Sequence, residues 1–139
     1  MTKSKLPMNK LPTKKAALVA ILDNNNKVLL YRRKNTWYEQ DKLALVGGNI
    51  DDGESPAHAA VREVFEETDI LIKPQNLTLL TEAIDRGYHI TYYICKDWSG
   101  TPTNKEPDRC SELVWHSIDN LPDDTIPVIK TILTTHDPA

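Results

Sequence analysis

Three glutamates near the middle of the chain have the spacing of a cation-binding helix face. Glu63, Glu66 and Glu67 stand at positions i, i+3 and i+4. On an α-helix, which turns about 100° per residue, these positions share one side. Like charges this close repel, so something must offset the cost. Solvation of a surface helix is one answer. The other is a hard cation such as Mg²⁺, which binds carboxylates together with substrate phosphates.

Residues 55–68 are predicted to form the helix that carries these glutamates. Ser55 is a favourable N-cap, and Pro56 stands at the first helical position, where its missing N–H costs nothing. An apolar side lies opposite the glutamates, so we expect the helix to dock on a sheet and to present all three carboxylates outward. The residues of that apolar side are Ala57, Val61, Val64, Phe65 and Thr68.

Short apolar runs on either side of this helix are typical of strands. The runs 16–22 and 27–31 flank the turn-forming residues 23–26, so we expect a hairpin. A third run, 43–46, is stopped by the pair Gly47–Gly48. Three more strands are expected after the helix, at 77–84, 88–96 and 110–116, with a polar, proline-containing loop at 97–109.

A final helix is expected after Leu121. Either Asp124 or Thr125 is a suitable cap, apolar residues follow, and Pro127 falls in the first turn, where proline is tolerated. The order strands, helix, strands, helix indicates an α+β or mixed α/β fold.

The segment that leads into the first helix completes a longer pattern. Two glycines there allow a backbone carbonyl to approach a metal ion or a phosphate closely. The full string is Gly48-x5-Glu54-x7-Arg62-Glu63-Val64-Phe65-Glu66-Glu67-Thr68-Asp69-Ile70. It resembles the Nudix box, Gly-x5-Glu-x7-Arg-Glu-U-x-Glu-Glu-x-Gly-U, in which U is an aliphatic residue.

Two positions depart from the family pattern. Asp69 stands where the family has Gly after the helix, a place that favours left-handed backbone. Asp is among the few other residues that adopt this conformation, so we expect a small stability cost and intact chemistry. Val46 stands where many members have Pro before the glycine pair, outside the chemistry.

The resemblance implies a fold and a division of the chain. The fold is a Nudix-type α/β/α sandwich, in which helices flank a mixed sheet. Residues 14–139 would form the Nudix hydrolase domain, and residues 1–13 a flexible N-terminal tail. The stretch 32–38 is similar to the corresponding strand end of the MutT-like branch, whose members are nucleoside triphosphate pyrophosphatases.

Roles for the box residues follow from the same resemblance. Nudix enzymes hydrolyse a nucleoside diphosphate linked to some group X, with metal ions that bridge phosphate oxygens and activate water. Glu63 would be the general base, oriented by Arg62, although the family varies in whether this glutamate is base, metal ligand or both. Glu54 would be a structural partner of Arg62. The residues implied to hold Mg²⁺ or Mn²⁺ are Gly48 through its carbonyl, Glu63, Glu66 and Glu67.

Other residues are candidates for contacting the substrate. Arg33 suits a phosphate, because a guanidinium matches phosphate geometry, and it equally suits a solvated strand end. Glu106 and Glu112 lie near where relatives place an additional acidic ligand, or on ordinary surface. Asp123 and Asp124 resemble a base-reading pair in some oxidised-purine hydrolases, and a helix cap explains them equally well.

Aromatic side chains are the candidates for contact with a nucleobase. Trp37, Trp98 and Trp115 suit either stacking on a base or packing in the protein. The four histidines show no metal-ligand spacing and are interpreted as structural.

Composition limits the alternatives. The 139 residues carry 17 Lys and Arg against 20 Asp and Glu, a net charge of −3, so a nucleic-acid polymer is not an expected partner. No run of about 18 apolar residues predicts a membrane span. The basic start lacks the apolar region of a secretory signal, and two cysteines are too few for a disulfide scaffold. We therefore expect a cytoplasmic protein, as a monomer or homodimer.

Two classes of function are consistent with these residues. One is a Mg²⁺-dependent nucleotide pyrophosphohydrolase, most simply of nucleoside triphosphates. The other is a non-catalytic, nucleotide-binding regulatory module. Such modules typically lose box glutamates, and all three are present here, which favours the enzyme. Ordinary and oxidised triphosphates, sugar nucleotides and dinucleoside polyphosphates stay open as substrates, because loops set specificity.

Overall fold

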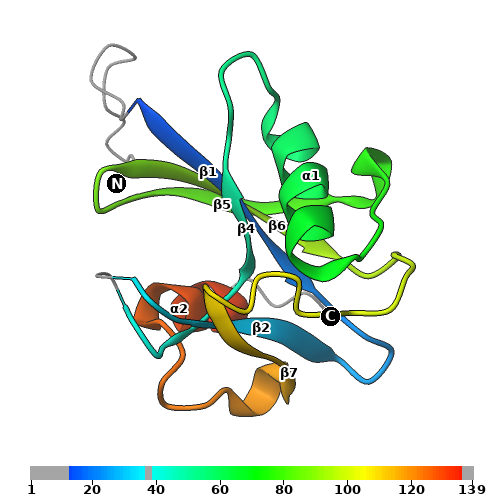
Figure 1. Cartoon of the computed structure of the whole chain (residues 1–139), viewed down its shortest axis with the longest axis vertical. Helices are drawn as coiled ribbons and strands as arrows, with labels where there is room; N and C mark the ends of the chain where they lie inside the picture. The colour runs from blue at the N-terminus through cyan, green and yellow to red at the C-terminus, as the bar shows by residue number, and fades with distance from the viewer. Residues whose placement is uncertain (1–12, 37–38, 136–139) are drawn as a thin grey trace.

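The computed structural model describes residues 13–36 and 39–135. The expected tail, apart from Thr13, and Trp37 lie outside the described residues. In the described part, strands form two sheets, and two α-helices lie on opposite sides of them (Figure 1).

The larger sheet is mixed, as expected. Its four strands have the order β4-β1-β6-β5. β1 runs parallel to β6, whereas β4 pairs with β1 and β5 pairs with β6 in antiparallel fashion. The bounds are β1 (Lys14–Ile21), β4 (Val46–Asn49), β5 (Thr78–Asp85) and β6 (Tyr88–Cys95).

The smaller sheet is antiparallel, with the order β3-β2-β7. Its strands are β2 (Lys27–Arg33), β3 (Leu43–Ala44) and β7 (Cys110–Ser117). The strands predicted at 27–31, 77–84, 88–96 and 110–116 are thus confirmed, with ends shifted by one or two residues.

Helix α1 (Pro56–Thr68) covers one side of the sheets, and α2 (Pro127–Thr135) covers the other (Figure 1). Short 3-10 turns stand at Pro74–Asn76 and Ile118–Asn120. β1 serves both sides, because alternate side chains of a strand point to opposite faces. Ala17, Val19 and Ile21 join the core under α1, whereas Ala20 joins the core under α2. This double burial explains why the run 16–22 is continuously apolar.

β1 and β2 do not form the predicted hairpin, because they do not pair along their length. The two strands belong to different sheets and are joined only by an isolated bridge between Leu22 and Val28. Asp23 does form the expected turn, since its carboxylate accepts from the backbone N–H groups of Asn25 and Lys27 at 2.8 and 2.9 Å. The strands diverge beyond the turn because β1 takes β4 and β6 as neighbours and β2 takes β3 and β7.

The sequence predicted that the glycine pair would end a strand, and this prediction is wrong. Gly47 and Gly48 lie inside β4, opposite Leu18 and Ala17 of β1. Gly47 has a φ of +135°, and a Cβ there would overlap the Ala17 carbonyl oxygen. The run 43–46 is therefore split between β3 and β4, one in each sheet.

The last helix begins later than predicted, at Pro127. Neither Asp124 nor Thr125 caps it. Instead this segment pairs with β3, since the Leu43 N–H donates to the Asp124 carbonyl and the Ile126 N–H donates to the Leu43 carbonyl, both at 2.9 Å. No helix in residues 13–36 and 39–135 is long and apolar enough to cross a membrane.

Candidate active site

Helix α1 begins and ends where local sequence dictates. Ser55 is the N-cap, and its hydroxyl accepts from the His58 backbone N–H at 3.1 Å. At the other end Asp69 has φ 65° and ψ 6°, the predicted left-handed conformation, and its N–H donates to the Phe65 carbonyl. The helix predicted over 55–68 is confirmed, including the unusual residue that ends it.

The face that α1 buries differs in part from the predicted one, because Val64 and Thr68 are fully buried as expected but Phe65 is not. Glu67 is only 7% exposed, whereas Phe65 is 42% exposed. The helix docks through Ala59, Ala60 and Val64, which turns Glu67 toward β4 and Phe65 toward solvent. The expectation that all three carboxylates point outward is therefore wrong for Glu67.

The glycines of β4 explain this rotation. Gly47 donates its backbone N–H to Glu67 Oε1 at 2.8 Å, which gives the buried carboxyl a partner. A Cβ at Gly48 would come closer to the Glu63 carboxylate than real Cβ atoms approach. Gly48 therefore lets β4 lie close to α1 without displacing Glu63, whereas a Cβ at Gly47 would meet Ala17 and Leu18 of β1.

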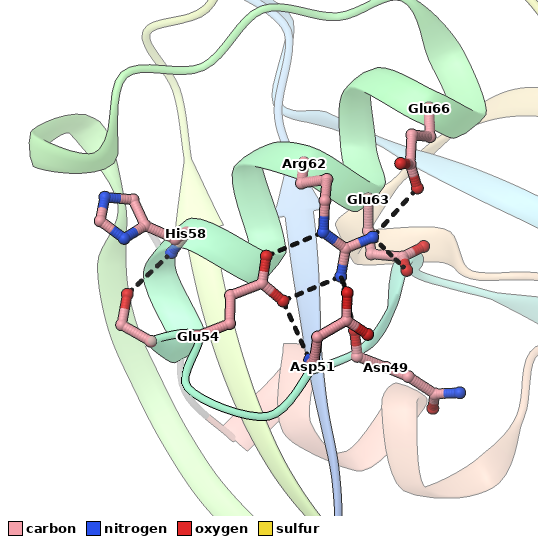
Figure 2. A network of polar contacts seen from close by, with 8 residues as sticks. Asn49, Asp51, Glu54, His58, Arg62, Glu63 and Glu66 are labelled. Atoms are coloured by element: carbon pink, nitrogen blue, oxygen red, sulfur yellow. Dashed lines mark hydrogen bonds and ion pairs between the residues drawn. The ribbon is translucent and has the colours of Figure 1, made fainter.

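Arg62 holds the rest of the acidic face together (Figure 2). It grips Glu54 with two hydrogen bonds of 2.8 and 2.9 Å, so the predicted structural pair is confirmed. One guanidinium nitrogen, Nη1, also donates to Glu63 Oε1 at 3.0 Å and Glu66 Oε1 at 3.1 Å. The Asn49 carbonyl accepts from Nη2 at 3.0 Å. The hydrogen bonds from Arg62 lower the pKa of Glu54 to about 2.

Burial distinguishes the box glutamates from one another. Burial raises the pKa of Glu67 to about 9. The hydrogen bond from the Gly47 N–H opposes this rise, and the negative charge of Glu106 adds to it. Burial also raises the pKa of Glu63, and Arg62 opposes that rise. A raised carboxyl pKa is one feature of general bases and of sites that bind cations.

The groups implied to bind a metal ion are the carboxylates of Glu63, Glu66 and Glu67 and the backbone carbonyl of Gly48. These oxygen atoms suit a hard divalent cation. The space at Gly48, which a Cβ would fill, lies next to Glu63. As the side chains stand, however, no three His, Cys, Asp or Glu side chains of the described residues converge well enough to hold a metal ion. Arg62 and the Gly47 N–H hold the carboxylates instead, so a cation would have to compete with these hydrogen bonds.

A cavity of about 560 Å³ opens beside these carboxylates. Its lining includes Glu63, Glu67 and both glycines of β4. It also includes four cationic side chains: Arg33, Lys34, Arg86 and Arg109. The apolar part of the wall comes from β1, β6, the start of α2 and the residue before it, with Leu18, Ile90, Tyr92, Ile126, Val128 and Ile129.

The structure separates the other candidates. Arg33 lines the cavity, and its contact with a phosphate stays a prediction. Glu106 accepts a hydrogen bond from Tyr31, which itself lines the cavity, at 3.3 Å. Glu112 is instead paired with Arg32, outside the cavity lining.

The acidic pair before α2 does not reach the cavity. Asp124 accepts from Arg32 at 2.6 Å, and Asp123 is fully exposed near Lys130. Trp98 and Trp115 stack on each other, with ring centroids 5.9 Å apart, and neither lines the cavity. The sequence-based reasoning missed the cavity residues Tyr31, Arg109 and Tyr92, which lie far from the box in sequence and carry no motif.

Comparison with known proteins decides the family. The model of the NUDIX domain matches residues 12–135, nearly the whole chain. The chain belongs to the Nudix hydrolase family. An Escherichia coli protein named 8-oxo-dGTP diphosphatase is 34% identical over 122 residues, which cover 84% of this chain and 93% of that protein. A Methanocaldococcus jannaschii protein named ADP-ribose pyrophosphatase is 33% identical over 109 residues, which cover 76% of this chain and 63% of that protein.

Solved structures agree with this Nudix assignment. The MutT NUDIX hydrolase from Burkholderia pseudomallei has a TM-score of 0.77 at 29% identity, covering 87% of this chain and 95% of that one. The MutT protein from Methanosarcina mazei has a TM-score of 0.74 at 20% identity, a likeness of fold. The predicted α/β/α Nudix fold and the MutT-like resemblance are confirmed.

Proposed function

We propose that this Nudix hydrolase is a Mg²⁺-dependent nucleotide pyrophosphohydrolase that cleaves a nucleoside diphosphate linked to a group X. The observation that carries the proposal is the composition of one cavity. Its lining combines the box carboxylates Glu63 and Glu67 with four cationic side chains and an apolar wall. A nucleotide needs all three: activation of water, neutralisation of phosphate charge, and apolar contact for the base.

Glu63 is the proposed general base. Its Oε1 accepts from Arg62, while Oε2 faces Gly48. In the proposed reaction a water attacks one phosphorus of the diphosphate, the bond from that phosphorus to the bridging oxygen breaks, and the other phosphate leaves with that oxygen. Glu63 Oε2 accepts the proton that the attacking water releases. Arg62 fixes the orientation of the carboxylate, and the half-buried setting raises its basicity.

Mg²⁺ or Mn²⁺, when bound, would neutralise phosphate charge and lower the pKa of the attacking water. The residues proposed to hold it are the Gly48 carbonyl, Glu63, Glu66 and Glu67. Glu106 is proposed as a further acidic contact, because its charge already acts on both Glu63 and Glu67.

Arg33 is the proposed phosphate contact, together with Lys34 and Arg109 from the same lining. The nucleoside would lie against Tyr92 and Ile126. Asp123 and Asp124 are not part of this proposal, because Arg32 and solvent already account for them.

The relative named 8-oxo-dGTP diphosphatase makes purine nucleoside triphosphates, ordinary and oxidised, the first substrates to test. The experiment is a panel of these compounds with ADP-ribose and a dinucleoside polyphosphate, assayed with Mg²⁺ for release of phosphate and diphosphate. Turnover of at least one nucleotide supports the proposal. Nucleotide binding without turnover on any member would favour the regulatory-module alternative.

A cytoplasmic monomer or homodimer that acts on small molecules stays the expectation for the protein as a whole.

A further inference from the structure

Lys105 lies at the C-terminal end of α1, in contact with Phe65 of the helix and with Asp69, the residue that follows it. The ammonium Nζ is 2.8 Å from Asp69 Oδ1 and 4.7 Å from the centre of the Phe65 ring. Phe65 is the apolar side chain that faces solvent instead of the core. Asp69 is the residue that replaces the glycine of the family pattern. The departure from the pattern thus carries a side-chain contact that glycine does not make.

The loop around Lys105 also completes the backbone of the helix end. The last carbonyls of an α-helix have no partner within the helix. Here the Thr103 N–H donates to the Thr68 carbonyl at 2.9 Å, and the Lys105 N–H donates to the Glu67 carbonyl at 3.1 Å. The last turn of α1 has no basic residue of its own. Lys105 supplies the positive charge that favours this end of a helix dipole.

The residue after Lys105 is Glu106, which the loop holds toward the buried carboxylates. Its N–H donates to Asn104 Oδ1 at 3.0 Å, and its carboxylate accepts from the Tyr31 hydroxyl. The Lys105 backbone is bonded to the residue, Glu67, whose carboxyl Glu106 influences. A shift of the loop along α1 would therefore move Glu106 relative to Glu67.

We propose that the Asp69–Lys105 ion pair is a positioning device that sets the distance of Glu106 from Glu67 and thereby the affinity of the site for divalent cations. The inference rests on the proposed function only in taking these carboxylates as the cation site. In this account Lys105 and Asp69 are positioning residues, which touch neither substrate nor cation.

A purely local role would leave the cation site unaffected. Asp69 and Lys105 side chains are 41% and 36% exposed, and pairs this exposed contribute little to stability. The useful readout is therefore cation affinity, measured without substrate, alongside the free energy of unfolding. Mn²⁺ is the probe, by titration calorimetry or by the loss of its free-ion magnetic resonance signal.

The variants are Asp69→Asn, Lys105→Met, the double variant and Lys105→Arg. Asn tolerates the left-handed conformation as Asp does, so Asp69→Asn removes the charge and little else. Each single variant should weaken Mn²⁺ binding about threefold, the range that loss of an exposed ion pair allows. The double variant should be no weaker than either single one, and Lys105→Arg should keep wild-type affinity.

The matched control is Glu82→Gln, which removes the carboxylate charge that lies 2.8 Å from His89 between β5 and β6, at two residues that do not line the cavity. It should leave Mn²⁺ affinity unchanged. Should Lys105→Met fail to fold, Asp69→Asn and Lys105→Arg still decide the question.

Unchanged Mn²⁺ affinity in Asp69→Asn, or additive losses in the double variant, would overturn the inference. Nucleotide turnover by the wild type separates this failure from failure of the proposed function. If the wild type hydrolyses a nucleotide and the variants bind Mn²⁺ as the wild type does, the positioning role is contradicted and the proposed function stands. If the variants bind Mn²⁺ more weakly but the wild type hydrolyses no nucleotide, the proposed enzymatic function is contradicted and the positioning role is supported.

Discussion

The backbone N–H of Gly47 donates to Glu67 Oε1 at 2.8 Å, so a strand of the mixed sheet holds the buried carboxyl of the helix. This contact joins the glycine pair of the sequence pattern to its glutamates. It places the carboxyl of Glu67 in the protein interior, whereas Glu63 and Glu66 accept hydrogen bonds from Arg62. Two physical environments on one helix face follow from it.

The stability of the metal-free protein should fall as pH rises. Native Glu67 keeps its proton up to about pH 9, whereas in the unfolded chain the carboxyl loses it near its ordinary value of 4.5. Between these values the native state binds more protons than the unfolded state, so raising the pH lowers the free energy of unfolding. The stabilising contribution is complete below the ordinary value and is lost as the pH passes through about 9.

Urea unfolding in EDTA, at several pH values between about 5 and 9, tests this for wild type and Glu67→Gln. The Gln variant cannot titrate here, so wild type should lose stability relative to it as the pH rises. Glu66→Gln, in which the exposed neighbour is changed, should follow wild type. Parallel curves for wild type and Glu67→Gln would show that Glu67 is already ionised at neutral pH.

Changing Gly47 to alanine should mainly lower stability, whereas changing Gly48 to alanine should mainly lower activity. A Cβ at Gly47 meets the Ala17 carbonyl and takes a φ of +135°, so Gly47→Ala should lose about 1–3 kcal/mol of stability or more. A Cβ at Gly48 meets the flexible end of Glu63, which can move aside. Gly48→Ala should therefore fold with a smaller loss but with a displaced Glu63, and kcat should fall by about 10²-fold.

Denaturant midpoints and kcat for the two glycine variants supply the measurement. Equal stability losses in both variants would contradict the different contacts assigned to Gly47 and Gly48, and full activity in Gly48→Ala would contradict the close approach of Gly48 to Glu63.

Replacing Arg62 with lysine should impair activity although the charge is kept. The guanidinium bonds Glu54 through two nitrogens while it also bonds Glu63, and an ammonium cannot span both in this geometry. We expect kcat to fall about 10–100-fold, with a smaller change in KM, because Glu63 loses its orientation. Arg32→Lys is the matched control, since Arg32 also bridges two carboxylates, those of Glu112 and Asp124, outside the cavity lining. A similar loss of kcat in both variants would argue against a specific orienting role.

Local signals in the sequence predicted local structure well. Ser55 and Pro56 predicted the start of α1, the family resemblance implied the pairing of Glu54 with Arg62, and the family glycine position indicated a left-handed Asp69. Contacts between distant segments were not predictable in this way. The orientation of α1, which buries Glu67 and exposes Phe65, goes with the hydrogen bond from the Gly47 N–H of β4 to Glu67, a contact between distant segments.

The segment before α2 shows the same limit. Its acidic residues have good capping character, but their backbone pairs with Leu43, about 80 residues earlier, and Arg32 takes the Asp124 carboxylate. The Asp69–Lys105 pair joins the box to a loop that carries no motif. The small stability cost expected of Asp69 in place of glycine is opposed by this ion pair, which glycine cannot make.

The central claim, that Glu63 acts as base in metal-dependent hydrolysis, is tested most directly by nucleotide turnover of wild type and Glu63→Gln, each with Mg²⁺ and with EDTA. Gln keeps the shape of the side chain and removes its basicity. The account predicts turnover only with Mg²⁺, about 10²–10⁴-fold slower in Glu63→Gln, and not restored by more Mg²⁺. Equal rates in all four conditions, or a Glu63→Gln rate that recovers fully at high Mg²⁺, would contradict it.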